Sequence, residues 1–93
     1  MRLSSPEIDR IKQCIAGFDP DARVFLFGSR VDDTKKGGDI DLLILSKIMD
    51  YHSKLELKGR LLDHFDEQKM DIVIEPEVSK PFVRLIYKKA IEL

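Results

Sequence analysis

Three aspartates stand where strands are expected to begin, with a spacing that could hold a metal ion. Asp39 and Asp41 are two residues apart in a largely apolar segment, so both side chains should project from one face of a strand, with Cα atoms about 6.6 Å apart. Asp71 interrupts a second apolar segment, residues 70–74, one residue after its start. If these two strands pair in parallel, the three carboxylates meet at one edge of the sheet.

Such a group of acids is costly without a cation. Two ionised carboxylates about 5 Å apart repel by about 3 kcal/mol at an effective dielectric of about 20, which is a large share of the roughly 5–15 kcal/mol that stabilises a domain. His52, His64 and Cys14 do not have the spacing of zinc ligands. Oxygen ligands therefore favour Mg²⁺ or Mn²⁺. The alternative is that the acids only make strand ends soluble.

Gly28 and Ser29 directly follow a short apolar segment, Arg-Val-Phe-Leu-Phe at residues 23–27. A glycine lets the backbone approach a ligand closely, and consecutive N–H groups in a turn can bind an anion. The serine hydroxyl adds a further donor. Alone, this pair is usually just a turn. Followed after eleven residues by Asp39 and Asp41, it indicates an anion site beside the acids.

The hydrophobic pattern predicts the elements that must position these residues, in the order helix, strand, strand, helix, strand, helix. We expect helices over residues 5–18, 50–65 and 79–93, and strands over residues 23–27, 39–45 and 70–74. Ser5 is the expected N-cap of the first helix. Residues 28–38 should form a turn or loop that can include a helical turn after Ser29. The fold class is α/β (α+β), with a small mixed β-sheet flanked by helices.

Each predicted helix has apolar residues at helical spacing, which we expect to face the sheet. These are Ile8, Ile11, Ile15 and Phe18 in the first helix, Tyr51, Leu55, Leu61, Leu62 and Phe65 in the second, and Phe82, Leu85, Ile86 and Ala90 in the third. The basic residues Lys80, Arg84, Lys88 and Lys89 fit a solvated helix face, with an RNA-binding patch as the alternative.

The length and charge of the chain limit its function. Its 93 residues are enough for one domain, residues 1–93, and leave no room for a separate substrate domain. A net charge of −1 gives no general attraction to nucleic acid or to anionic membranes. No apolar run approaches the roughly 20 residues of a membrane span, and the first residues lack the apolar core of a secretory signal. We therefore expect a cytoplasmic protein.

Two motifs resemble a known family. Residues 26–30, Leu-Phe-Gly-Ser-Arg, and residues 38–44, Gly-Asp-Ile-Asp-Leu-Leu-Ile, resemble the signature of the DNA polymerase β-like nucleotidyltransferase superfamily, specifically its minimal nucleotidyltransferases. The resemblance implies a nucleotidyltransferase fold. It also implies nucleotide binding by Gly28, Ser29 and Arg30, and coordination of two Mg²⁺ ions, or Mn²⁺, by Asp39 and Asp41. The third carboxylate, Asp71, is implied to bind one metal and to help deprotonate the attacking hydroxyl.

The segment after the Gly-Ser-Arg motif departs from the family pattern. Gly38 replaces the serine that often precedes the first aspartate, and Asp32 and Asp33 follow Val31 where the family often has a basic residue and a glycine. These acids would oppose a triphosphate. Lys35 and Lys36, together with Arg30, could compensate; a solvated surface role for these cations is the alternative.

The resemblance implies transfer of a nucleoside monophosphate, AMP from ATP, to a hydroxyl. Minimal nucleotidyltransferases of this kind resemble the antitoxins of two-component modules whose toxin is a helical HEPN ribonuclease. The acceptor would then be a tyrosine hydroxyl of that toxin, in a hetero-oligomer. The alternative from another class is a binding module of the same fold that neutralises its partner by occlusion. Transfer to a small molecule ranks last because the chain lacks an additional domain for it.

Overall fold

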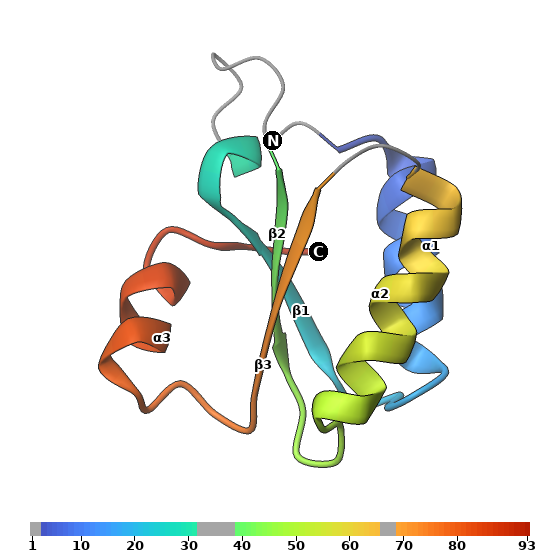
Figure 1. Cartoon of the computed structure of the whole chain (residues 1–93). Coiled ribbons are helices and arrows are strands. Elements are labelled where there is room, and N and C mark those ends of the chain that lie inside the picture. Colours follow the sequence, from blue (N-terminus) through green and yellow to red (C-terminus); the bar gives the residue numbers. More distant parts are fainter. Residues whose placement is uncertain (1–2, 32–38, 66–68) are drawn as a thin grey trace.

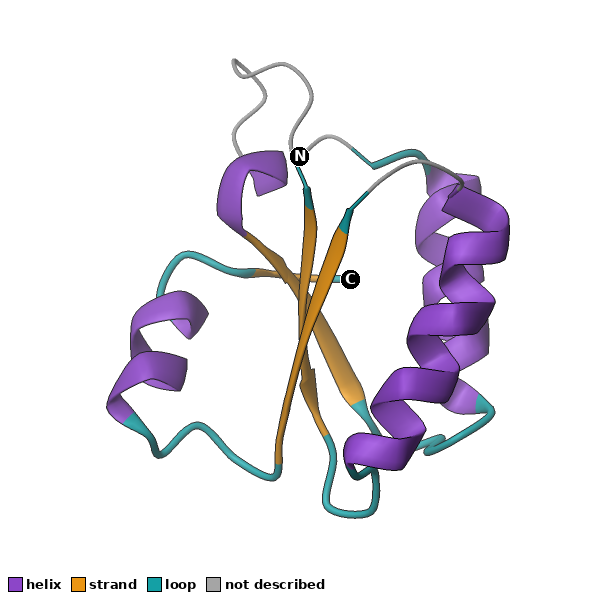
Figure 2. Cartoon of the chain, viewed as in Figure 1, coloured by secondary structure: helices purple, strands orange, loops and turns teal. Residues whose placement is uncertain are grey.

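A four-stranded sheet lies between two helices on one face and a third helix on the other (Figures 1 and 2). The computed structural model describes residues 3–31, 39–65 and 69–93. The helices are α1 (Ser5–Ala16), α2 (Tyr51–Phe65) and α3 (Pro81–Tyr87), with a 3₁₀ helix, η1 (Gly28–Val31). The strands are β1 (Arg23–Phe27), β2 (Ile40–Leu45), β3 (Met70–Glu75) and β4 (Ile91–Glu92). The predicted fold class is confirmed.

The N-cap of helix α1 lies one residue earlier than predicted, at Ser4. The side chain of Ser4, and not of Ser5, accepts a hydrogen bond from the Glu7 N–H at 3.3 Å, and the Glu7 carboxylate accepts one from the Ser4 N–H at 2.8 Å. This reciprocal capping box satisfies two N–H groups that the first turn leaves without helical partners. The helix ends at Ala16, so Phe18 lies beyond it but still packs against the core.

The sheet has the strand order β3-β2-β1-β4. Strands β2 and β3 pair in parallel, which is the condition under which Asp41 and Asp71 were expected to meet, and α2 connects them. Strand β1 pairs antiparallel with both β2 and β4. Strand β3 is therefore an edge strand. Parallel pairing needs such a crossover, because the chain must return to the same end of the sheet before the second strand begins.

The prediction of a helix to the end of the chain was wrong. Helix α3 ends at Tyr87, and Ile91–Glu92 pairs with β1 as a fourth strand. The Leu93 N–H donates to the Val24 carbonyl at 2.9 Å, and Glu92 receives two hydrogen bonds from the Arg23 guanidinium at 2.9 and 3.1 Å. These contacts with β1 stabilise an extended conformation at the end of the chain. They involve residues that are distant in sequence, so the local helical pattern of this short segment did not indicate them.

The strands alternate their side chains between two cores. Even-numbered residues of β2 and β3, such as Leu42 and Ile72, pack against α1 and α2, while Phe25 and Leu43 pack against Val83 of α3. Odd-numbered residues of β2 and β3 therefore share the α3 face of the sheet. This alternation decides on which face Asp41 and Asp71 lie.

The predicted buried faces of α2 and α3 were only partly correct. Leu61 and Phe65 are buried, but Leu57 is the third core residue of α2, and Tyr51 and Leu55 are 70% and 50% exposed. In α3 the buried residue is Val83. Helical spacing shows that a helix has apolar residues along one side. Which of two neighbouring sets of these residues contacts the sheet depends on the angle at which the helix packs against it. None of the described helices combines the length and the apolar character needed to cross a membrane.

A buried polar contact fixes the turn that leads into α2. The Ser46 hydroxyl donates to Asp19 Oδ2 at 2.6 Å and accepts from the N–H groups of Met49 and Ile48 at 3.0 and 3.3 Å. Asp19 and Ser46 are both buried. The contact therefore ties the end of β2 to the segment after α1, in the turn that precedes the crossover helix.

Candidate active site

The sheet register places two of the predicted acids side by side. Phe27 of β1 is opposite Asp41 of β2, and Asp41 is opposite Asp71 of β3, so the three residues form one row across the sheet. The next row on the same face contains Phe25, Leu43 and Val73. The sequence prediction that parallel pairing brings Asp41 and Asp71 together is confirmed.

The row of acids lies at the end of the sheet that α3 leaves open. Helix α3 has only seven residues, and its buried side chain, Val83, packs with Phe25 and Leu43. Asp41 is consequently half-buried and Asp71 is exposed, while Asp39 lies half-buried just before β2 begins. Carboxylates in these positions can be reached by a ligand or an ion from solvent.

Gly28 lies directly against the Asp41 carboxylate. Its φ of 78° falls in the left-handed region, and a Cβ added there would overlap Asp41 Oδ2. Glycine is favoured on both counts, because other residues adopt this conformation only at a cost and a Cβ would fit only if the Asp41 side chain moved. The end of β1 and the acids of β2 are thus parts of one site, at the upper end of the sheet in Figure 1.

The other residues of the predicted anion site follow in η1. Ser29 and Arg30 belong to this 3₁₀ helix, which gives the helical turn expected after Ser29. Arg30 is only 9% exposed, so its guanidinium is not the solvated surface cation considered as an alternative. The predictions for Asp32, Asp33, Lys35, Lys36 and Gly38 lie outside the described residues.

The electrostatics of the site show unbalanced negative charge. Burial raises the pKa of the Asp41 carboxyl, and the negative charges of Asp71 and then Asp39 raise it further. Both causes disfavour the ionised form of Asp41. A divalent cation bound beside these carboxylates would act in the opposite direction and stabilise the ionised form.

The carboxylate oxygens of the site are ligands that a hard cation prefers. Their arrangement, however, is only partly that of a complete metal site. Asp41 and Asp71 offer carboxylate oxygens from adjacent strands, which suit Mg²⁺ or Mn²⁺. However, the described residues contain no group of three or more His, Cys, Asp or Glu side chains arranged to hold a metal. The adjacent pair is therefore preformed, and Asp39 would have to close on the ion to complete a three-carboxylate site.

A groove of about 400 Å³ adjoins the two acids. It is lined by Asp41, Asp71 and Phe27, and it continues over β3. The remaining lining residues were not predicted to belong to the site: Lys54, Lys58, Ile72, Val73 and Phe82. The position of Phe27 follows from pairing β1 with β2, and could have been found in that way. For the lysines and Phe82 no sequence signal existed, because α2 and α3 reach the groove only through tertiary packing.

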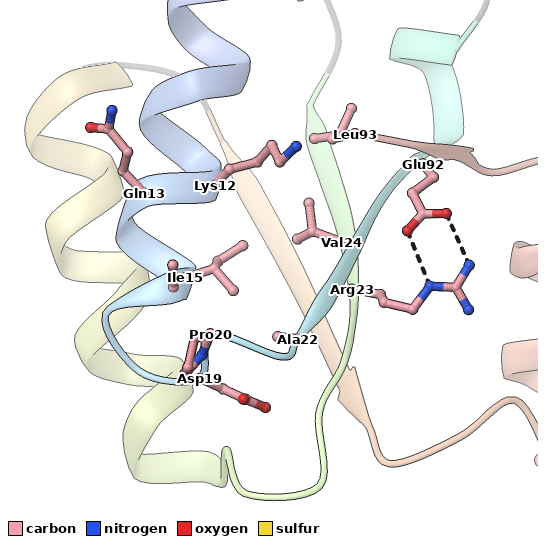
Figure 3. A pocket seen from close by; sticks show the side chains of 11 residues that line it. Lys12, Gln13, Ile15, Asp19, Pro20, Ala22, Arg23, Val24, Glu92 and Leu93 are labelled. Carbon is pink, nitrogen blue, oxygen red and sulfur yellow. Dashed lines mark hydrogen bonds and ion pairs between the residues drawn. The ribbon is translucent and has the colours of Figure 1, made fainter.

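A second pocket, of about 370 Å³, lies between α1 and the β1–β4 edge (Figure 3). Apolar side chains such as Ile15, Val24 and Leu93 line it, and the Arg23–Glu92 ion pair stands at its rim. It contains none of the predicted site residues. The groove beside Asp41 and Asp71 is therefore the cavity associated with the candidate chemistry.

Comparison with known proteins identifies the family of the chain. A family model described as a nucleotidyltransferase domain matches residues 8–93. The chain belongs to this family. No curated protein sequence matches the chain significantly.

Two solved structures resemble this nucleotidyltransferase domain. A mutant of the toxin–antitoxin pair MntA–HpeT aligns with a TM-score of 0.73 and 18% identity, over 97% of this chain and 71% of that one. A protein provisionally assigned as a nucleotidyltransferase aligns with a TM-score of 0.65 and 26% identity, over 96% and 99% of the two chains. The first similarity shows that the fold is shared.

Proposed function

We propose that this nucleotidyltransferase domain moves a nucleoside monophosphate, AMP from ATP, to a hydroxyl of a partner protein. The attacking oxygen forms a bond to the α-phosphorus while the bond from that phosphorus to the bridging oxygen breaks, and pyrophosphate leaves. The hydroxyl proton passes to a carboxylate. Family membership supports the class of reaction, and the arrangement of this chain's own residues supports the division of roles.

Gly28, Ser29 and Arg30 are proposed to bind the triphosphate. The backbone at Gly28 can come close to an anion because no Cβ stands there, and the residues after it curl into η1. This turn would hold the leaving pyrophosphate beside Asp41. Orienting the leaving group in this way reduces the entropy cost of reaching an in-line geometry.

Asp39, Asp41 and Asp71 are proposed to hold divalent cations, two Mg²⁺ ions or Mn²⁺ in their place. When bound, these ions would neutralise charge on the attacked phosphate and on the leaving group. Asp71 is the most exposed of the three acids and would also accept the proton of the attacking hydroxyl. Burial and the charges of Asp71 and Asp39 raise the pKa of Asp41, which supports a role for a cation as counter-charge at this site.

The contact between Gly28 and the Asp41 carboxylate is the observation that carries this proposal. A phosphate-binding turn and a metal-binding acid could each occur separately for structural reasons. Here a left-handed glycine, at φ 78°, brings the backbone of the turn directly against the carboxylate. Packing a turn this tightly against an acid has a clear use if both contact the same ligand, a nucleoside triphosphate with its cation.

The partner is proposed to be a HEPN-family toxin, with this chain as its antitoxin and a toxin tyrosine as acceptor. The fold shared with a chain of the toxin–antitoxin pair MntA–HpeT supports a toxin as the partner, while the HEPN class and the tyrosine acceptor rest on the resemblance of the two sequence motifs to minimal nucleotidyltransferases. The test uses ATP labelled at the α-phosphate, Mg²⁺, and the protein encoded by the neighbouring gene. We expect label on the partner, no label from ATP labelled at the γ-phosphate, and loss of labelling in Asp41→Asn. Labelling that persists in this variant would refute the mechanism.

Occlusion of the partner without chemistry is the second candidate. The observation in its favour is that the described acids do not form a preformed three-ligand group. It predicts a tight complex of the two proteins, neutralisation of the toxin, and no label from either form of ATP. The same labelling experiment, combined with size-exclusion chromatography of the mixture, therefore separates the two functions.

A further inference from the structure

The groove beside the acids runs over the open edge of the sheet. Asp71, Ile72 and Val73 of β3 form its floor, Lys54 and Lys58 of α2 stand on one side, and Phe82 of α3 stands on the other. Figure 1 shows α2 and α3 on opposite sides of β3. Because β3 is an edge strand, none of the strands formed by the described residues covers this groove.

The order of residues across the sheet gives the groove a direction. Gly28 follows β1, Asp41 lies in β2, and Asp71 lies in β3, so the two carboxylates that line the groove separate the phosphate-binding turn from the part of the groove over β3. In an in-line displacement the attacking and leaving oxygens lie on opposite sides of the phosphorus. If pyrophosphate leaves toward Gly28, the acceptor enters from the β3 side. This step rests on the proposed function.

The side chains on the groove indicate what kind of acceptor would fit. Lys54 and Lys58 are one helical turn apart, and neither forms an ion pair with a described carboxylate. By contrast, Glu56 pairs with His52, and Lys80 pairs with Glu75. The two lysines thus offer positive charge beside the acidic floor of the groove.

The two helices that contribute to the groove also carry exposed apolar side chains, of which Phe82 lines the groove itself. Phe82 is 59% exposed, and Leu85, one turn along α3, is 72% exposed. On α2, Leu55 and Tyr51 are exposed next to the lysines, and the Lys54 ammonium lies 6.0 Å from the centre of the Tyr51 ring. Large apolar side chains that remain exposed around a groove are typical of a surface that a protein partner covers.

We propose that this groove docks an acidic segment of the acceptor protein, which presents its hydroxyl to Asp71. Lys54 and Lys58 pair with carboxylates on either side of the acceptor residue, and Phe82 contacts the apolar part of the segment. These three residues determine acceptor specificity and do not take part in the chemical step. The triphosphate is held on the other side of Asp41, so the lysines serve the acceptor and not the nucleotide.

The test measures binding to the whole chain of a fluorescein-labelled peptide in which a tyrosine is flanked by three glutamates on each side. The control peptide has lysines in place of the glutamates. We expect the acidic peptide to bind and the basic one not to. The double charge reversal Lys54→Glu with Lys58→Glu should weaken binding by about tenfold or more, because two attractive pairs become repulsive.

A matched variant separates local from overall charge. Lys12→Glu with Lys47→Glu gives the same net charge, but Lys12 and Lys47 lie outside the groove. It should leave peptide binding nearly unchanged. Equal weakening by both double variants, binding of the basic peptide, or no binding of the acidic peptide would each overturn the proposal. Far-UV circular dichroism is used to check that both variants are folded.

Transfer kinetics distinguish this proposal from the proposed function. With a partner that the wild-type chain labels, Lys54→Glu with Lys58→Glu should raise KM for the partner and leave KM for ATP unchanged. A raised KM for ATP would assign the lysines to the nucleotide and overturn the docking proposal alone. Absence of labelling by the wild-type chain counts against the proposed function, while peptide binding still tests the groove.

Discussion

Replacing Gly28 by alanine tests the contact on which the site depends. The substitution adds one methyl group, which would overlap Asp41 Oδ2, and it forces a residue with a side chain to adopt φ 78°. Two separate costs follow. The backbone must hold a left-handed conformation, and the Asp41 side chain must move away from its position.

Both costs have known magnitudes. A residue other than glycine in the left-handed region costs about 1–2 kcal/mol. Pushing a side chain away from its preferred rotamer costs about 0.5–1.5 kcal/mol. We therefore expect Gly28→Ala to lower the free energy of unfolding by about 1.5–3.5 kcal/mol, which is roughly 1–2 M in the urea midpoint of a domain of this size. Nucleotidyl transfer should fall as well, because Asp41 is displaced.

The assay is urea unfolding followed by far-UV circular dichroism, since the chain contains no tryptophan. Gly59→Ala serves as the matched control. A Cβ at Gly59, in the interior of α2, would meet no atom within 4 Å. The same chemical change should there stabilise the fold by about 0.5–1 kcal/mol, because alanine loses less backbone entropy in a helix.

A double-mutant cycle with Asp41→Ala separates the two costs. Without the carboxylate, the nearest Asp41 atom to the new methyl group would be Cβ at 3.5 Å, which is an ordinary contact. Gly28→Ala should then cost only the backbone part, about 1–2 kcal/mol. The reasoning would be refuted if Gly28→Ala costs less than about 0.5 kcal/mol, or if its cost is the same with and without the Asp41 side chain.

Two further predictions concern buried or half-buried polar groups. Asp41→Asn should raise the thermal midpoint at pH 7 in metal-free buffer. The raised pKa of Asp41 means that the folded state holds this proton more tightly than the unfolded state, so wild-type stability falls as pH rises above the unfolded value of about 3.9. The gain should shrink in thermal melts towards that pH; a constant gain would contradict this cause. Ser46→Ala should cost about 1–3 kcal/mol in urea unfolding, because the buried Asp19 carboxylate loses a 2.6 Å hydrogen bond and two N–H groups lose their acceptor. A change below about 0.5 kcal/mol would show that water replaces the hydroxyl.

Local signals in the sequence predicted the elements that have strong internal patterns. Strand β1 was predicted to the residue, because a continuous apolar run between a proline turn and a glycine leaves little choice. The prediction for the crossover helix α2, residues 50–65, was one residue too long at its start, because the helix begins at Tyr51. The strand at Ile91–Glu92 could not be predicted, because two residues carry no period and their position depends on the edge of β1.

The part of the site that depends on sequence spacing and on the pairing of β2 with β3 could be predicted. These placed Asp41 beside Asp71 and the Gly28 turn at the same end of the sheet. They did not place Lys54 or Phe82, because their positions depend on how α2 and α3 dock on the two faces. Contacts made by long side chains across an open sheet edge leave no periodic trace in a sequence.

The parallel register of β2 and β3 couples the acids to the hydrophobic core. Asp71 is flanked by Met70 and Ile72, which are buried under α1 and α2. A slip of β3 by one residue would move both of them to the α3 face of the sheet and drive Asp71 into the core under α1 and α2. The spacing between Asp41 and Asp71 is therefore kept by methyl and methylene groups on the far side of the sheet, so a core substitution at Ile72 that loosens this register would disturb the acids without touching them.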